Sequence, residues 1–230
     1  MKRIKSAFTY FSKGELLLWL GSLTVVLAAF FLFDRESYLS LSASLIGVTS
    51  LIFNAKGNPF GQLLMIIFSV LYGIISFGFA YYGEMVTYIG MTLPMAAFAL
   101  VSWLRNPYKG RRSQVKVNSI GKRELISSLM LTAAVTVIFY FILEFFSTAN
   151  IIPGTISVAT SFFAAYLTFR RSPYFALAYA LNDVVLLILW SLACLQDISY
   201  VSVLVCFAVF LVNDLYGFYN WTKMQRNQKL

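Results

Sequence analysis

The run VNDLYGFYNW, from Val212 to Trp221, decides the fold, because it places polar side chains inside a segment long enough to cross a bilayer. Residues 200–222 are otherwise apolar, and about 20 apolar residues span the hydrocarbon core. An ionised Asp at the bilayer centre costs about 2.5–3.5 kcal/mol on insertion scales. This segment nevertheless contains Asp214, and the apolar segment before it contains Asp183. Acids in two consecutive segments predict a polar site or a watery path inside a helix bundle.

Composition places the whole chain in a membrane. Of its 230 residues, 60% are hydrophobic and 12% are charged, whereas a soluble domain carries about 25% charged residues. The longest polar stretch covers residues 105–124, so we expect no attached nucleotide-binding domain, and the sequence has neither a P-loop nor a GxGxxG motif. The chain has no His, which excludes His-based proton relays and His metal sites. We therefore expect no metal and no cofactor.

The remaining composition signals concern redox chemistry and charge. Cys194 and Cys206 lie in or beside apolar segments, which indicates small buried side chains and no disulfide framework. The net charge is +9, but the bases are spread over short loops. They therefore report on orientation in the membrane, and nucleic acid is not expected as a partner.

Eight apolar segments predict an all-α integral membrane protein with eight transmembrane helices. With both termini on one side, that side receives 17 Lys and Arg residues, and the other side receives only Arg35. Because cytoplasmic loops are enriched in Lys and Arg, this asymmetry predicts that both termini are cytoplasmic. The expected spans are residues 16–33, 38–53, 60–82, 85–104, 123–146, 152–169, 174–194 and 200–222.

Spans 2–4 and spans 6–8 share features that predict an internal repeat. Each set has a short helix rich in Ser and Thr and then a basic turn that closes with a proline, Pro59 or Pro173. Each set ends at a tryptophan, Trp103 or Trp221, two residues before a base. Two parallel sets of three helices need one linking span between them, which gives a 3+1+3 plan. The expected domains are an extra N-terminal helix (1–37), the first repeat (38–104), a basic loop with the linking helix (105–146), and the second repeat with a tail (147–230).

Polar and aromatic residues within the spans are candidates for a binding site. Neighbouring residues on a helix project about 100° apart, so one member of each Asn-Asp pair can line a cavity while the other contacts a neighbouring helix. The sequence leaves open which member does which. Amides, carboxylates and aromatic rings suit a flat heteroaromatic ring that carries a polar sugar, and they also attract a cationic ring. The candidate substrate-binding residues are Gln62, Tyr72, Asn182, Asp183, Trp190, Asn213, Asp214, Tyr216, Tyr219 and Asn220.

The run NDLYGFYNW, the earlier Asn-Asp pair and the repeat plan together resemble the PnuC family of vitamin transporters. The family's motif reads approximately W-N-D-x-x-Y-x-x-Y-x-W, and Val212 replaces its first Trp. The resemblance covers about residues 38–222. The residues that match, the two tyrosines only approximately, are Asn213, Asp214, Tyr216, Tyr219 and Trp221.

The resemblance implies a fold similar to the SWEET sugar transporters and a facilitator of nicotinamide riboside without ATPase or ion coupling. It also implies a homotrimer in the lipid of the cell inner membrane, with the nucleoside trapped by cytoplasmic phosphorylation. Thiamine or another vitamin is the alternative substrate. On this interpretation Gln62, Asn182 and Asn213 bind ribose hydroxyls or the carboxamide. Trp190 and Tyr216 stack on the ring, and one of the two acids balances the pyridinium.

Three other interpretations of the two acids remain. An intramembrane aspartyl protease could use Asp183 and Asp214 as two carboxylates that share a proton. That enzyme class needs a GxGD-like run, and the neighbours here are Leu-Asn-Asp-Val and Val-Asn-Asp-Leu, so we do not expect an enzyme. A receptor or structural membrane protein without transport is the second. In the third, the Asn-Asp pairs only join helices, which is worth about 0.6 kcal/mol per hydrogen bond.

Overall fold

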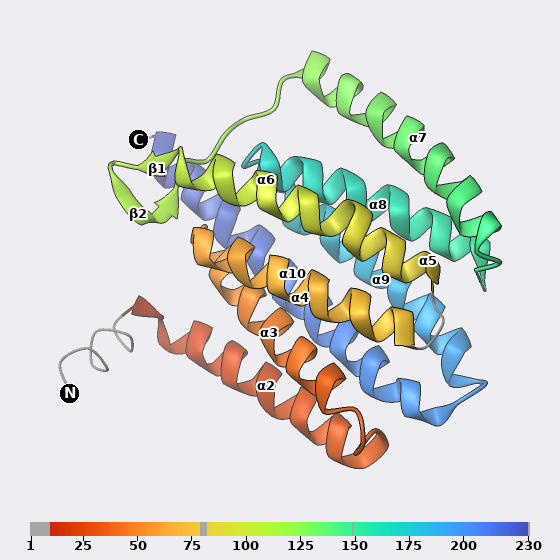
Figure 1. Cartoon of the computed structure of the whole chain (residues 1–230). Helices are drawn as coiled ribbons and strands as arrows, with labels where there is room; N and C mark the ends of the chain where they lie inside the picture. Colours follow the sequence, from red (N-terminus) through yellow and green to blue (C-terminus); the bar gives the residue numbers. More distant parts are fainter. Residues whose placement is uncertain (1–9, 79–81, 149, 230) are drawn as a thin grey trace.

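The computed structural model describes residues 10–78, 82–148 and 150–229. Within these ranges, 8 helical segments are long and apolar enough to cross a membrane, and Figure 1 shows them packed into one elongated bundle. The prediction of an all-α integral membrane protein with eight spans is confirmed. Seven spans are single helices: α2 (Lys13–Phe33), α3 (Tyr38–Ala55), α4 (Pro59–Gly78), α7 (Lys122–Phe145), α8 (Ile151–Phe169), α9 (Tyr174–Cys194) and α10 (Val201–Lys229).

The remaining span is interrupted. It consists of α5 (Tyr82–Thr87), the π-helical segment η1 (Tyr88–Thr92) and α6 (Leu93–Leu104). Pro94 lies in the first turn of α6 and has no N–H to continue the α-helical pattern into the preceding turn. The Leu93 N–H instead reaches the carbonyl of Tyr88, five residues back. A π-helical turn of this kind often marks a functional site.

Local chemistry explains where the helices begin and end. Ser12 and Glu15 form a reciprocal capping box at the start of α2, with bonds of 3.2 and 2.6 Å. Proline begins α4 and immediately precedes α9, where its missing N–H leaves nothing unpaired. After α3 and α8 the chain turns through a left-handed residue, Gly57 (φ 65°) and Arg171 (φ 58°), as helix C-termini commonly do.

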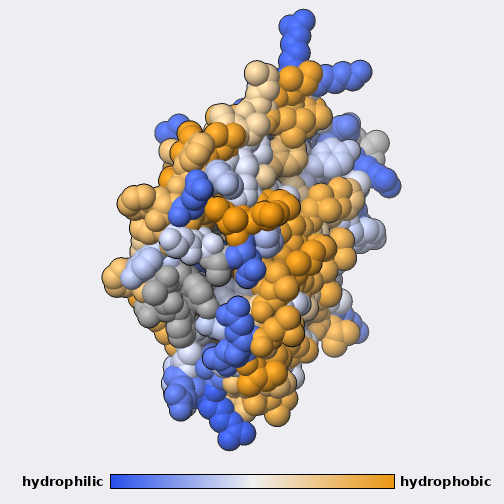
Figure 2. All heavy atoms as spheres, turned by 90° about the vertical axis from the view of Figure 1, so that its right-hand side faces the viewer, coloured by the Kyte–Doolittle hydropathy of each residue, from blue (hydrophilic) through white to orange (hydrophobic). Residues whose placement is uncertain are grey.

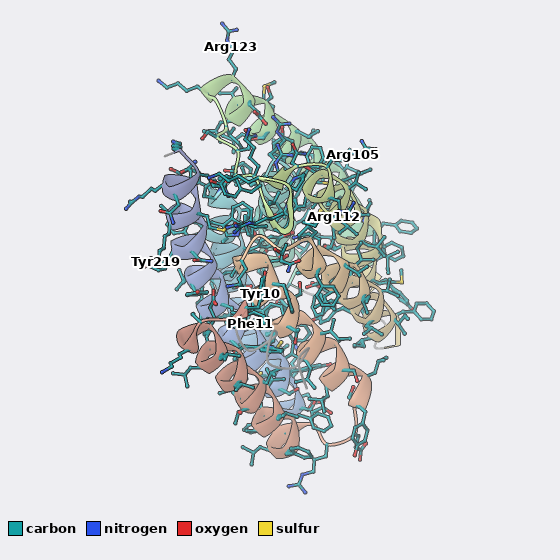
Figure 3. The ribbon with its side chains drawn as sticks, turned by 90° about the vertical axis from the view of Figure 1, so that its left-hand side faces the viewer. Tyr10, Phe11, Arg105, Arg112, Arg123 and Tyr219 are labelled. Atoms are coloured by element: carbon teal, nitrogen blue, oxygen red, sulfur yellow. The ribbon has the colours of Figure 1, made fainter. Side chains whose placement is uncertain are left out.

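The bundle has two chemically different ends. We call one the basic end; it holds the turn between α3 and α4, the turn between α8 and α9, and the loop of residues 105–121. That loop contains the short antiparallel hairpin of β1 (Pro107–Tyr108) and β2 (Arg111–Val115). Figure 3 views this end, with Arg105, Arg112 and Arg123 on it. We call the other the acidic end; there α2 turns into α3, and the short helix η2 (Ile198–Tyr200) leads into α10.

The last span extends further than the sequence predicts. α10 continues to Lys229, seven residues beyond the expected end at residue 222. The extension is held by the loop of residues 105–121, because Gln228 accepts from the Val117 N–H at 2.7 Å and donates to the Val115 carbonyl at 3.1 Å. The helix therefore continues past the membrane as a support for this loop.

Packing brings helices that are distant in sequence together. α4 packs against α3 and α6, while α9 packs against α8 and α10. The two groups meet where α10 contacts α3 and where α6 contacts α8. α2 packs on α3 and α10, whereas α7 packs mainly on α8 and stands apart on one side of the bundle in Figure 1. The space between the two groups of helices contains the polar residues considered next.

Candidate functional site

Two connected cavities lie between the two groups of helices. The larger, which we call the vestibule, has a volume of about 570 Å³ and opens at the acidic end. Figure 2 views this end and shows hydrophilic residues around the middle of the face, beside hydrophobic flanks. The smaller, which we call the chamber, has a volume of about 70 Å³ and lies deeper in the bundle. Phe68, Glu84 and Phe207 line both cavities, so the cavities adjoin at these residues, a place that we call the passage.

Two acids face each other in the chamber. Asp183 of α9 and Asp214 of α10 are 3% and 5% exposed, and their carboxyl groups lie within hydrogen-bonding reach of each other. Oδ2 of Asp183 has no hydrogen-bond donor within the described residues. Among those residues no Lys or Arg lines the chamber. Paired carboxylates in an apolar interior need a proton or a cation, so this chamber favours a positively charged ligand.

Amide side chains line the chamber on both sides. Gln62 of α4 donates to Oδ1 of Asn54 at 2.9 Å. On α9, Oδ1 of Asn182 accepts from Ser157 at 3.1 Å and from Thr160 at 2.8 Å. These bonds fix which way each amide points. Within the described chain they leave the Gln62 oxygen and the Asn182 nitrogen for a ligand in the chamber.

Aromatic rings separate the chamber from the vestibule. Tyr88, in the π-helical turn, lines the chamber and packs against Tyr72 with 4.3 Å between ring centroids. Tyr88 also meets Phe68 edge-on at 5.9 Å. Tyr72 and Trp190 line the vestibule and not the chamber. The structure therefore places these two candidates at the vestibule, nearer to the acidic end than Asp183 and Asp214.

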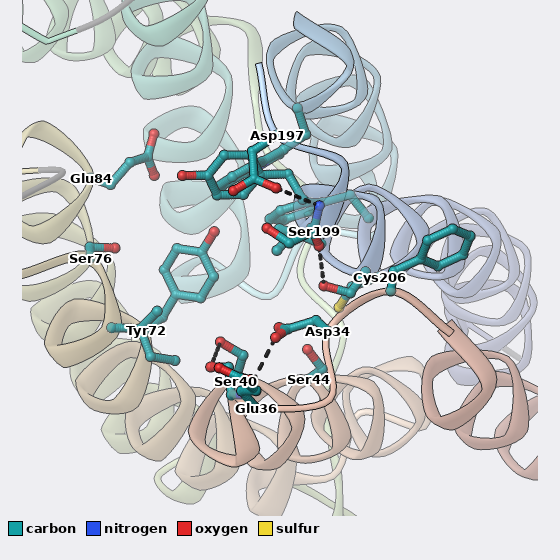
Figure 4. Close-up of a pocket in the computed structure, with 18 of the residues that line it drawn as sticks. Asp34, Glu36, Ser40, Ser44, Tyr72, Ser76, Glu84, Asp197, Ser199 and Cys206 are labelled. Atoms are coloured by element: carbon teal, nitrogen blue, oxygen red, sulfur yellow. Dashed lines mark hydrogen bonds between the residues drawn. The ribbon is translucent and has the colours of Figure 1, made fainter. Parts of the chain in front are cut away.

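Acidic residues dominate the vestibule. Its lining includes Asp34, Glu36, Glu84 and Asp197, with Arg35 as the one base among the described residues. In Figure 4, Glu84, Asp197 and the hydroxyl of Tyr72 point toward the middle of the cavity from different elements. The Ser199 N–H donates to Asp197 at 2.8 Å, and this bond holds the pKa of Asp197 below its usual range. The vestibule thus presents an anionic surface to the solvent.

The four other candidates, all on α10, lie outside both cavities. Asn213 donates to Ser22 of α2 at 2.9 Å and to the carbonyl of Val209 at 2.9 Å. The Tyr216 hydroxyl donates to Glu15 of α2 at 3.0 Å. Asn220 donates to the carbonyl of Ala55 at 2.8 Å. Tyr219 is 63% exposed and points away from the bundle in Figure 3.

This geometry answers the question that the Asn-Asp pairs left open. On α10 the acid Asp214 lines the chamber while Asn213 joins α10 to α2. On α9 both Asn182 and Asp183 line the chamber. The structure therefore brings together Gln62, Asn182, Asp183 and Asp214 out of the candidates.

Several residues that line the cavities were not among the candidates. Glu84 was expected in a loop because the span was predicted to begin at residue 85, whereas α5 already begins at Tyr82. Ser157 and Ser161 lie one turn apart on α8, a spacing that could have identified one polar helix face. Others that line the chamber are Asn54, Thr87, Tyr88, Thr92 and Tyr179.

Comparisons with known proteins agree with this arrangement. A family model described as "Nicotinamide mononucleotide transporter" matches residues 37–223. A nicotinamide riboside transporter PnuC from Neisseria mucosa is 23% identical over 227 residues, which are 97% of this chain and 85% of that protein. Another, from Haemophilus influenzae, is 20% identical and covers 96% of both chains. A crystal structure described as the vitamin B3 transporter PnuC shares the fold, with a TM-score of 0.82 at 21% identity over 95% of this chain and 94% of that one.

Proposed function

Because the chain belongs to the nicotinamide mononucleotide transporter family, we propose that it carries nicotinamide riboside across the membrane by facilitated diffusion. The family is one of multi-pass membrane transporters and not of enzymes, which sets aside a protease role for the two acids. The family's description names a nucleotide, while the two curated relatives are named for the nucleoside. The charge of the chamber decides between these substrates.

The observation that carries the proposal is a chamber lined by three carboxylates, Asp183, Asp214 and Glu84, and by no base among the described residues. A mononucleotide brings a phosphate with a charge of about −1.5 to −2 at neutral pH, which two neighbouring carboxylates repel. The riboside has no phosphate, and its pyridinium ring is a cation. Asp183 and Asp214 therefore favour the nucleoside.

Each group in the chamber has a role in this proposal. Asp183 and Asp214 balance the charge of the ring. The Gln62 oxygen and the Asn182 nitrogen bind the ribose hydroxyls or the carboxamide. Tyr88 offers a ring face next to this position, where it stacks on the pyridinium.

The remaining candidates act before or around the chamber. Trp190 and Tyr72 bind the ring first, in the vestibule. Asn213, Tyr216 and Asn220 keep α10 in place against α2 and α3. Tyr219 faces lipid from the edge of α10.

One end of the bundle is open and the other is closed, and in the proposed transport cycle the two ends exchange these states. The vestibule is open at the acidic end, while Trp103, Trp221 and Phe175 pack together beneath the chamber toward the basic end. We expect the two groups of helices to rock against each other, which closes the vestibule and opens the basic end. The basic end then faces the cytoplasm, as the positive-inside rule favours, and both termini with it. Phosphorylation there keeps the nucleoside inside the cell.

The proposal extends to the surroundings of the protein. It places the chain in the cell inner membrane as a homotrimer. The exposed apolar residues of α7, such as Leu129, Val137 and Phe141, favour a lipid or subunit contact on that side. Cross-linking in native membranes would test the trimer separately from transport.

Uptake into proteoliposomes tests the substrate. The wild-type protein should take up nicotinamide riboside but not nicotinamide mononucleotide, and thiamine should compete poorly. The double variant Asp183→Asn with Asp214→Asn should lose about 100-fold in kcat/KM, which corresponds to about 2.8 kcal/mol of lost charge balance. The control is Ser69→Ala, a buried polar residue of α4 that lines neither cavity. Uptake of the mononucleotide, or of thiamine alone, would overturn the proposal.

A further inference from the structure

Glu84 occupies a position shared by no other described residue. It lines the vestibule, the chamber and a third cavity of about 200 Å³ beside α7 and α9. The third cavity is also lined by Thr148, Leu189 and Gln196. A ligand that moves directly from the vestibule to the chamber therefore comes close to this carboxylate.

Helix geometry explains why Glu84 points into the passage. It lies on α5 four residues before Tyr88, and residues four apart lie on the same face of a helix. Tyr88 and Thr87 line the chamber, so the face that carries Glu84 is turned inward. In Figure 4 its carboxylate points toward the middle of the vestibule, opposite Asp197.

Glu84 has no base to neutralise it within the described part of the chain. The two ion pairs there join Glu15 to Lys56 and Glu124 to Arg170, and neither includes Glu84. An acidic side chain that lines an interior cavity without a neighbouring base attracts a cationic ligand.

Carboxylates occur at each level from the mouth to the chamber. Asp34, Glu36 and Asp197 lie in the vestibule, Glu84 in the passage, and Asp183 with Asp214 in the chamber. Asp183 adds independent evidence for a ligand, since it is 3% exposed and its Oδ2 lacks a donor while it faces the chamber. Arg35 is the one described base along this route, and it lies at the mouth.

We propose that Glu84 is the specificity-determining residue of the passage, which admits a cationic ring and disfavours an uncharged ring of the same shape. The proposal rests on the proposed function and names the property of the substrate that the passage recognises. A cation that leaves the vestibule loses hydration, and Glu84 offsets that loss where the two cavities adjoin. An uncharged ring gains nothing from the carboxylate and leaves it unpaired. Glu84 thus acts before the chamber and adds a second selection step.

The test compares nicotinamide riboside with its reduced, uncharged dihydro form in proteoliposomes that contain the full chain. Glu84→Gln keeps the shape and removes the charge. It should raise the KM for the cation about 10-fold, which corresponds to about 1.4 kcal/mol, and change inhibition by the uncharged form by less than about 2-fold. Glu84→Asp keeps the charge and should retain most of the preference for the cation. Glu144→Gln is the matched control, because Glu144 is an exposed carboxylate of α7 that lines none of these cavities, and it should change the preference little.

The outcomes separate this inference from the proposed function. If the wild-type protein transports neither form, the proposed function fails. If the wild-type protein transports the cation but Glu84→Gln weakens both forms equally, or neither, the inference about Glu84 is wrong. If Glu84→Gln does not fold, Glu84→Ala, which also removes the charge, decides: a selectivity role changes the ratio between the two forms, whereas a purely structural role leaves the ratio unchanged.

Discussion

The turn between α3 and α4 and the turn between α8 and α9 have the same backbone, although NAKGNP and TFRRSP share only their final proline. Gly57 and Arg171 both adopt the left-handed conformation, at φ 65° and 58°. Each donates its N–H at 2.9 Å to the carbonyl three residues back, Asn54 or Thr168. The contacts around the two turns are also alike, whereas α4 and α9, the helices that follow them, carry different polar residues at matching positions.

Each turn is bound by a tryptophan from the other half of the chain. Trp221 donates its indole N–H to the Asn54 carbonyl at 2.7 Å, and Trp103 donates to the Thr168 carbonyl at 2.9 Å. The loop of residues 105–121 binds both turns, through Val115 to Gly57 at 2.9 Å and through Asn118 to Arg171 at 3.0 Å. Each half of the chain therefore donates a tryptophan hydrogen bond to the turn of the other half.

The correspondence extends to α2 and α7. Lys56 pairs with Glu15, the third residue of α2, and Arg170 pairs with Glu124, the third residue of α7. The sequence assigns α2 as an extra helix and α7 as a linking helix, yet the two ion pairs give them equivalent positions. The first pair is buried, with side chains 17% and 5% exposed, and the second is open, at 37% and 25%.

The two acids that face each other in the chamber both come from the second half, whereas the third carboxylate of its lining, Glu84, comes from the first. Aligning Pro173 with Pro59 matches Asn182 and Asp183 to Phe68 and Ser69, and aligning the two tryptophans matches Asp214 to Ala96. At these three aligned positions the second half carries Asn and two Asp residues, and the first half carries Phe, Ser and Ala. We therefore expect the turns and the tryptophans to support the fold, and Asp183 and Asp214 to serve the ligand.

The largest effect should come from the buried ion pair. Glu15→Gln breaks a buried pair and should reduce the free energy of unfolding by about 3–5 kcal/mol. Glu124→Gln breaks the more exposed pair and should reduce it by less than about 1 kcal/mol. Thermal unfolding of the purified variants in detergent measures both. If both variants lose the same free energy of unfolding, the greater burial of the first pair does not make it more stabilising than the second.

A smaller effect should follow from the two tryptophans. Trp103→Phe and Trp221→Phe each remove one buried hydrogen bond and should each cost about 1–2 kcal/mol of stability. The two rings lie 5.3 Å apart, so the double variant should not show the simple sum. Melting temperatures of the two single variants and the double variant give the three values. If one single variant is far more destabilised than the other, the exchange of contacts is not symmetric.

The smallest effect should come from the first turn. Gly57→Ala should cost about 1 kcal/mol, because a Cβ in the left-handed conformation is strained and would lie 3.2 Å from Val115. Gly14→Ala is the matched control, since Gly14 lies in α2 with open space around it and alanine favours a helix. The melting temperature should fall for the first variant and hold or rise for the second. A stable Gly57→Ala variant would show that the left-handed turn tolerates any residue, as it does Arg171.

Much of this fold follows from the sequence, because membrane spans are set by length and apolarity. Apolar runs and loop charges predicted all eight spans, and the polar residues of the last two spans predicted a polar interior. The direction in which each side chain points was harder to predict, because Asn213 and Asp214 are neighbours on one helix and differ only by a rotation about its axis. Glu84 was missed because its span was predicted to begin at residue 85, whereas α5 already begins at Tyr82. Tertiary contacts, such as those of Tyr216 and Asn220 with α2 and α3, leave no local signal.

The π-helical turn at Tyr88–Thr92 stores one additional residue in its span. If that residue were released into regular α-helical register, α5 would rotate by about 100° and advance by about 1.5 Å relative to α6. Glu84 would swing out of the passage, and Tyr88 would change the side of the helix on which it lies. A slip of one residue within a single helix would thus act as a gate on the route to the chamber while the ends of the bundle stay in place.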